Sequence, residues 1–204
     1  MTKEQMREAI IHRANGGFLD SDVMSRFHPV VVDIWIQMAI NTILNATARK
    51  MDDHELDIYT REVTDITVLK DSDGRYYCVL PKKYVQLPRN MGIRYVRDNA
   101  TDNNNKVRHY TPSTVSAERV FDDLEVNSVM DEPTVIVHGN TLYFKDFDDE
   151  MGKVAVGIIQ AWESYGEGDE FHIPAGNEMM FVESVFNLVA GTKPADESND
   201  NVSN

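Results

Sequence analysis

The stretch from Pro133 to Gly191 constrains the fold most, because strand-forming runs follow one another there and lead into a helix. The runs 134–137 and 141–144 flank His138-Gly139-Asn140, and glycine and asparagine tolerate the positive φ that a two-residue hairpin turn requires. The run 153–162 predicts a third strand, apolar on both faces near its middle. A proline-containing entry then leads into a predicted helix over 175–190. No catalytic motif interrupts this stretch, so it informs on architecture alone.

The longest helical run is 30–50, and it follows a proline that suits the first position of a helix. Its polar residues recur every four positions and form one narrow stripe, and most other positions are apolar. The stripe consists of Asp33, Gln37, Asn41 and Asn45. A helix this apolar is either central in a core or shared with another subunit, and the sequence leaves both open.

Between the terminal helices, alternating patterns and turn residues predict strands at 61–69, 75–80, 90–97 and 106–110. The predicted fold class is α+β, with N-terminal helices that include the long helix at about 29–50, an antiparallel β-rich sandwich or barrel-like body, and a C-terminal helix. We expect a single domain over 1–191, divided into a helical N-terminal region 1–52, a β-rich body 57–173 and the helix 175–190. Residues 192–204 are polar and without periodicity, which predicts a disordered tail. A short helix is also predicted at 113–125.

Composition excludes several classes of protein. The 204 residues carry 20 basic and 34 acidic side chains, a net charge of −14, which argues against a surface that grips nucleic-acid phosphates throughout. The only cysteine, Cys78, permits no intrachain disulfide and is interpreted as inert core filling in a protein made in a reducing cytoplasm. The apolar run 30–44 is too short and too often interrupted to predict a membrane span, so we expect a soluble protein.

A local cluster of basic residues lies in the middle of this acidic chain. It has two interpretations, either neutralisation of neighbouring acids within an assembly, which we favour, or a nucleic-acid site. The cluster comprises Arg89, Arg94, Arg97, Lys106 and Arg108.

The sequence contains no phosphate-binding loop, no nucleophile elbow and no closely spaced histidines. The best metal candidate is the acidic loop Asp146, Asp148, Asp149 and Glu150, because oxygen ligands there could converge on a divalent cation. A solvated loop that protects a sheet edge is the favoured interpretation. We therefore expect no enzyme activity, no catalytic residue, no cofactor and no bound metal.

Four phrases carry a resemblance to a known class of protein. They are Tyr84-Val-Gln-Leu-Pro-Arg-Asn-Met-Gly-Ile-Arg-Tyr-Val96, Asn140-Thr-Leu-Tyr-Phe144, the strand 153–162, and His172-Ile-Pro-Ala-Gly-Asn-Glu178. In their order and setting, the chain resembles the head-to-tail connector ring proteins of short-tailed bacteriophages, particularly crAss-like phages. The resemblance spans most of residues 29–191 and lies in the order of the elements.

The resemblance implies a non-enzymatic virion protein that is made in the host cytoplasm and has no membrane anchor. It implies a homo-oligomeric ring of about twelve copies in the neck, between the portal and the tail, in contact with the portal and other neck or tail ring proteins. Genomic DNA would pass through the ring during ejection without specific binding, which suits a negative lumen. The candidate subunit interface comprises Val31, Ile34, Trp35, Met38, Phe181, Val185 and Phe186.

Two alternatives remain. One is a cytosolic binding module or a phage assembly factor that never enters the particle. The other, less favoured, is a metal-dependent enzyme centred on the acidic loop 146–150.

Overall fold

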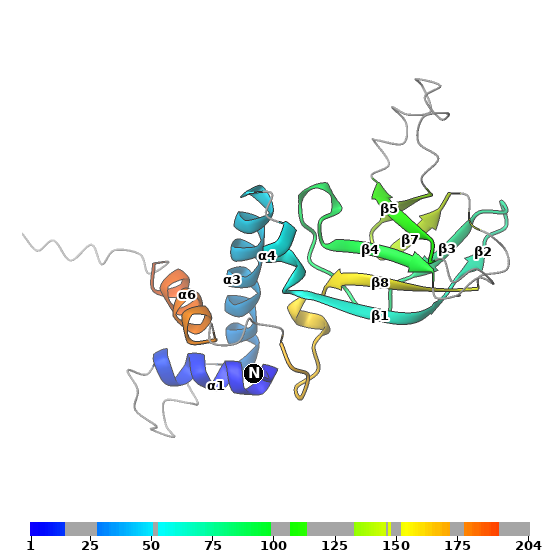
Figure 1. The fold of residues 1–204 in the computed structure, drawn as a ribbon. Helices are drawn as coiled ribbons and strands as arrows, with labels where there is room; N and C mark the ends of the chain where they lie inside the picture. Colours follow the sequence, from blue (N-terminus) through cyan, green and yellow to red (C-terminus); the bar gives the residue numbers. More distant parts are fainter. Residues whose placement is uncertain are drawn as a thin grey trace, which may run out of the picture. The chain divides into compact units, whose positions relative to one another are not determined.

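The computed structural model describes residues 1–14, 28–50, 53–98, 107–113, 133–145, 147, 152–171 and 178–191 (Figure 1). The chain divides into two compact units. Unit 1 comprises Met1–Ile40 together with Glu167–Asn204, and unit 2 comprises Asn41–Gly166. The sequence predicted one domain over 1–191, whereas the structure groups the helices of both chain ends in one unit and the β-rich body in the other.

Unit 1 contains helix α1 (Lys3–Ala14), the first half of helix α3 (Pro29–Lys50) and helix α6 (Glu178–Gly191). Helix α1 begins with a reciprocal capping box. The main-chain N–H of Gln5 donates to Thr2 Oγ1, and the main-chain N–H of Thr2 donates to Gln5 Oε1. α1 packs against α6, where the Arg13 guanidinium lies 5.8 Å from the centre of the Phe186 ring. The fully buried side chains of this unit include Met6, Ile10, Val32, Ile36, Val182 and Val185.

A half-buried ion pair links α1 to α3 within unit 1. Arg7 Nε donates to Asp33 Oδ1 at 2.6 Å, and the guanidinium also pairs with Glu167. These two carboxylates raise the pKa of Arg7, so its charge is permanent. The Arg7–Asp33 ion pair accounts for the one acidic residue in the apolar run of α3, because Asp33 binds α3 to α1 through Arg7.

Unit 2 is built on an eight-stranded sheet with the strand order β1-β8-β4-β5-β6-β7-β3-β2. The strands are β1 Thr60–Thr67, β2 Leu69–Lys70, β3 Tyr76–Val79, β4 Ile93–Asp98, β5 His109–Ser113, β6 Thr134–His138, β7 Thr141–Phe144 and β8 Lys153–Ile159. Among the described residues of this unit, short helices accompany the strands, namely α4 Asp53–Asp57, η1 Pro88–Asn90 and η3 Trp162–Ser164. The strands pair antiparallel except β5 with β6.

The sheet is nearly closed because its two outermost strands belong to one continuous segment. β1 pairs with β8 at one edge, β2 pairs with β3 at the other, and only Val68 separates β1 from β2. The Val68 N–H donates to the carbonyl of Gly152 at 3.0 Å, which anchors the junction between β1 and β2. β5 makes a similar transition, since Tyr110 pairs with β4 while Thr111 begins the parallel pairing with β6.

The predicted α+β class with a barrel-like body and terminal helices is therefore confirmed. The predicted hairpin at 134–144 forms, with Gly139 at a φ of +58° in its turn. The barrel interior is apolar, and the residues of β8 from Val154 to Ile159 are buried on both faces, as their sequence predicts. The largest members of this core are Tyr84, Tyr110, Leu142, Phe144, Ile93 and Ile158.

Some boundaries differ from the prediction. β3 pairs with the preceding segment over only Leu69 and Lys70, and its longer partner is β7. β8 ends at Ile159, because Trp162 begins a 3-10 turn rather than extending the strand. The predicted helix 113–125, the entry to α6 at 172–177 and the tail 192–204 lie outside the described residues, apart from Ser113, which ends β5.

Candidate functional site

The first candidate is a row of exposed apolar side chains on α3, which we name the α3 outer face. It consists of Val30, Val31, Ile34 and Met38, whose side chains are 57%, 40%, 50% and 57% exposed. Val30 and Val31 each lie three or four positions before Ile34, and Met38 lies four positions after it, a spacing that places residues on one side of a helix. Val32, Ile36 and Ala39 of the same helix are fully buried.

The polar stripe of α3 does not lie on this exposed side. Asp33, Gln37, Asn41 and Asn45 are all half-buried. The Asn45 side-chain amide donates to the Asn41 carbonyl at 2.8 Å, so some of the stripe's hydrogen bonding is satisfied within the helix. The side of α3 that is most exposed between Val30 and Met38 is therefore apolar, which is unusual for a helix at a solvent boundary.

The seven predicted interface residues fall into three groups. Val31, Ile34 and Met38 are exposed, and Trp35 and Phe186 are half-buried. Phe181 and Val185 are buried within the chain, and the Phe181 ring lies 5.7 Å from that of Phe171, so neither side chain offers an open surface. Their helical spacing marks the inward side of α6, and the exposed apolar residues of that helix are instead Met179 and Met180.

By length and composition alone, α3 could cross a membrane, and it is the one helix among the described residues that meets this test. The helix is 22 residues long. It therefore extends beyond the apolar run 30–44, which on its own is too short to span a membrane. One third of its most apolar window is buried inside the protein. Core helices of water-soluble proteins meet the same test, so this property is weak evidence for a membrane.

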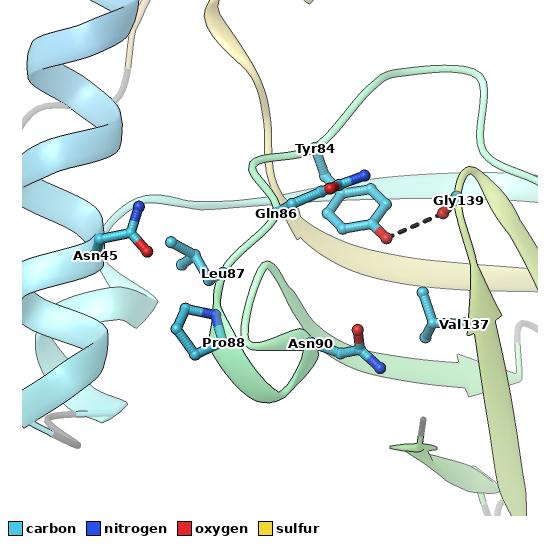
Figure 2. A pocket seen from close by; sticks show the side chains of 8 residues that line it. All are labelled: Asn45, Tyr84, Gln86, Leu87, Pro88, Asn90, Val137 and Gly139. Carbon is cyan, nitrogen blue, oxygen red and sulfur yellow. Dashed lines mark hydrogen bonds between the residues drawn. The ribbon is translucent and has the colours of Figure 1, made fainter. Parts of the chain in front are cut away.

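The second candidate is a cavity of about 490 Å³ in unit 2, shown in Figure 2. Its described walls come from three segments: the C-terminal half of α3, the segment 84–90, and the end of β6 with the turn that follows it. The described residues that line it are all uncharged. They are Asn45, Tyr84, Gln86, Leu87, Pro88, Asn90, Val137 and Gly139.

Hydrogen bonds hold several of these groups in place. Tyr84 Oη donates to the Gly139 carbonyl at 3.0 Å, and burial of the ring raises the pKa of Tyr84 (Figure 2). The Asn90 side-chain amide donates to the Ser113 carbonyl at 3.0 Å. Arg89 and Asn90 both adopt left-handed backbone conformations with φ of 57° and 58°, which is uncommon for an arginine and shapes the turn after Pro88. Sequence patterns contain no signal of this cavity, because its walls come from segments far apart in the chain.

Groups that could perform catalysis are not gathered in the described part of the chain. The Cys78 thiol is fully buried and its pKa is raised by burial to about 12, which makes it a poor nucleophile. Among the described residues no cluster of three or more histidine, cysteine or acidic side chains could hold a metal ion. Asp146, Asp148, Asp149 and Glu150 lie outside the described residues.

The central arginines form ion pairs within unit 2. Arg94 pairs with Asp57 at 2.9 Å and Arg97 with Glu62 at 2.7 Å. Hydrogen bonds from Arg97 and Tyr95 lower the pKa of Glu62, so the carboxylate stays ionised. These pairs occur between elements of one chain and favour charge neutralisation over phosphate binding for Arg94 and Arg97. Lys106 lies outside the described residues.

No protein-family model matches the sequence, and no curated protein matches it. The features that bear on function are therefore the α3 outer face, the cavity and the charge of the chain.

Proposed function

We propose that the protein is a virion structural protein, a homo-oligomeric ring in the neck of a short-tailed bacteriophage, between portal and tail. The observation that carries the self-association is the α3 outer face, where four large apolar side chains are exposed on one side of a helix. Exposed apolar surface of this kind marks sites of protein contact in soluble proteins. The neck position comes from the sequence resemblance.

A ring requires that one surface of each copy contact a different surface of its neighbour, so that rotation closes the assembly. The α3 outer face supplies one of these surfaces. The net charge of −14 per copy favours a channel that repels DNA, because like charges keep a translocating polyanion from binding the wall.

The test is the particle mass of the purified full chain by light scattering, with negative-stain imaging, alone and mixed with the portal protein of the same phage. We expect a ring, or a monomer that assembles on the portal. The variants Ile34→Glu and Met38→Glu should each lower assembly at least tenfold, because a charge would be buried in the contact.

Ala46→Glu is the matched control, since Ala46 is an exposed residue of the same helix outside the α3 outer face and the added charge is identical. Unfolding curves of all three variants should resemble that of the wild type. A strict monomer under every condition, including with portal, would refute the ring. Assembly that both face variants leave unchanged would refute the role of α3.

A further inference from the structure

A patch of apolar side chains lies on the outer side of four neighbouring strands of unit 2, β2, β3, β7 and β6 (Figure 1). Leu69 lies opposite Tyr77, and Tyr77 lies opposite Tyr143. Tyr143 in turn lies opposite Ile136, so these side chains form one row across the strands. Val79 points to the same side as Tyr77, because side chains two positions apart in a strand share a face. We name these five residues the sheet outer patch.

The sheet outer patch is accessible on the surface of unit 2. The side chains that alternate with its members point inward and belong to the barrel core. Leu69 and Val79 are 49% and 52% exposed, and the other three members are half-buried. Among the described residues outside α3 and α6, the other exposed large apolar residues, Ile58 and Val107, lie outside the sheet. The sheet outer patch is therefore the place in unit 2 where exposed apolar side chains gather on one face.

Charge favours a contact between copies at this patch and at the α3 outer face. A chain with a net charge of −14 repels a second copy over most of its surface. All members of the sheet outer patch are uncharged, and Asp71 and Asp73 in the adjacent turn pair with Arg75 at 3.0 and 3.1 Å. The α3 outer face is also uncharged, and the neighbouring Asp33 pairs with Arg7. Both surfaces are apolar and have neutralised carboxylates beside them.

The aromatic members of the patch are poorly placed to stack a nucleobase or a sugar. The Tyr143 ring lies 6.0 Å from the Tyr77 ring, and the Arg75 guanidinium lies 5.5 Å from its centre. These two neighbours occupy space that a stacked ligand would need. A nucleic acid would also meet the carboxylates of Asp71 and Asp73 at the edge of the patch. An apolar protein surface suits the patch better.

The α3 outer face matches the patch in size as well as in character. From Val30 to Met38 a helix rises about 12 Å at about 1.5 Å per residue. Four strands about 4.8 Å apart place the row from Leu69 to Ile136 over about 14 Å. Packing of an apolar helix stripe on the apolar face of a sheet is a common way to bury both.

We propose that the sheet outer patch of one copy binds the α3 outer face of the next copy. This inference rests on the proposed function and names the second surface that a closed ring requires. The two surfaces differ, so each copy inserts its α3 outer face into one neighbour and receives α3 from the other. Leu69 and Val79 form the exposed part of the patch and contact Ile34 and Met38 of the incoming helix.

The first experiment places a charge in the patch of the full chain. Under the conditions in which the wild type assembles, Val79→Glu should lower the association constant at least tenfold in sedimentation velocity, because the contact would bury an unpaired charge. Val107→Glu is the matched control, since it makes the same exchange at an exposed valine of unit 2 outside the patch. Urea unfolding curves confirm that both variants fold, and Leu69→Glu replaces Val79→Glu if that variant unfolds.

The second experiment mixes two variants that each have one intact surface. Ile34→Glu retains the sheet outer patch, and Val79→Glu retains the α3 outer face. Each should be monomeric alone, and the mixture should form one-to-one pairs that cannot grow further, because the remaining surfaces carry charges. A disulfide between Met38→Cys copies and Val79→Cys copies detects weak pairs, since the native Cys78 is fully buried.

Each result supports or overturns the proposal. Patch variants that assemble like the wild type would overturn it and leave the ring of the proposed function standing. Patch variants that block assembly, with neither pairs nor disulfides in the mixtures, would also overturn it, because the two surfaces would then not meet.

Two further outcomes separate the contact from the ring. Open chains of the wild type, with pairs in the mixture, would refute the ring and leave the contact standing. A monomeric wild type without disulfides would overturn both. Binding of a labelled oligothymidine that Val79→Glu abolishes would assign the patch to nucleic acid and overturn the proposal.

Discussion

Gly92 is a position where the structure has no room for a side chain. A Cβ atom placed on Gly92 would lie 1.9 Å from the Val85 carbonyl oxygen, which is a main-chain atom. Val85 is attached to β8 by its own N–H, and the Ile159 N–H donates to the Gly92 carbonyl at 2.8 Å. Neither backbone can move without breaking one of these bonds. The close approach places Val85 against the residue that precedes β4.

We predict that Gly92→Ala lowers the free energy of unfolding by roughly 2–4 kcal/mol, the effect of overpacking against a fixed backbone. Urea denaturation followed by the fluorescence of the two tryptophans, of which Trp162 is buried in unit 2, measures it. Gly168→Ala is the control, because a Cβ there meets nothing within 4 Å and should change stability by less than about 0.5 kcal/mol. Equal stability of both variants would contradict the close approach of residues 85 and 92.

At Gly157 the side chain of a neighbouring residue occupies the space that a Cβ atom would need. A Cβ there would lie 2.3 Å from the Tyr95 ring, so the ring occupies the space above this glycine in β8. The Tyr95 hydroxyl donates to Glu62 at 2.8 Å, and burial with this bond raises the pKa of Tyr95 to about 12. The tyrosine thus joins β4 to β1 across the intervening β8, which stabilises the order of the strands on this face.

Among the elements, the segment 60–70 decides whether the sheet closes. Its first residues pair with β8 and its last two pair with β3, so the junction at Val68 connects the two edges of the sheet. Asp65, with a φ of 59°, lies in the irregular stretch between Val63 and Ile66, where the register shifts. Bulges of this kind increase the local twist of a strand and help a sheet to curve.

We predict that Val68→Pro lowers the free energy of unfolding by about 2–4 kcal/mol, because proline removes the N–H that donates to Gly152 and fixes φ at the junction of β1 and β2. Val68→Ala separates this effect from loss of the side chain, which packs partly against the barrel core and should cost only about 1 kcal/mol. Equilibrium urea unfolding gives both values. If the two variants were equally stable, the Val68 hydrogen bond would not support closure.

Local sequence patterns were sufficient to predict the hairpin around Gly139, the length of α3 and the burial of β8 on both faces. Each of these features depends on residues that are neighbours in sequence. The barrel closure at Val68 could not be predicted, since it depends on two partners that are far apart in the chain. For α3 the sequence left a core helix and a shared helix both open. Val31, Ile34 and Met38, which the sequence offered as interface candidates, are exposed, while Asp33 of the polar stripe pairs with Arg7 of α1. The cavity had no sequence signal, because single residues such as Asn45 and Gly139 meet only in the fold.

At the scale of the whole molecule, two properties oppose each other in any self-association. Each copy carries a net charge of −14, so copies repel one another. The α3 outer face is apolar, and its burial is favourable at about 25 cal/mol per Å² of apolar area removed from water. Repulsion between exposed charges is screened by salt over a Debye length of about 10 Å at 0.1 M, whereas apolar burial is not weakened by salt. The balance should therefore depend on ionic strength.

We predict that raising sodium chloride from about 0.05 M to about 0.5 M increases the association constant of the protein at least tenfold, because the salt screens the repulsion and leaves the apolar contact intact. Sedimentation velocity over a range of protein concentrations measures it. Met38→Glu should remain dissociated at both salt concentrations, since screening cannot restore a lost apolar contact. Ala46→Glu should respond to salt like the wild type. If salt instead dissociated the assembly, ion pairs would hold the copies together, and the contact would have to lie among charged residues rather than on the α3 outer face.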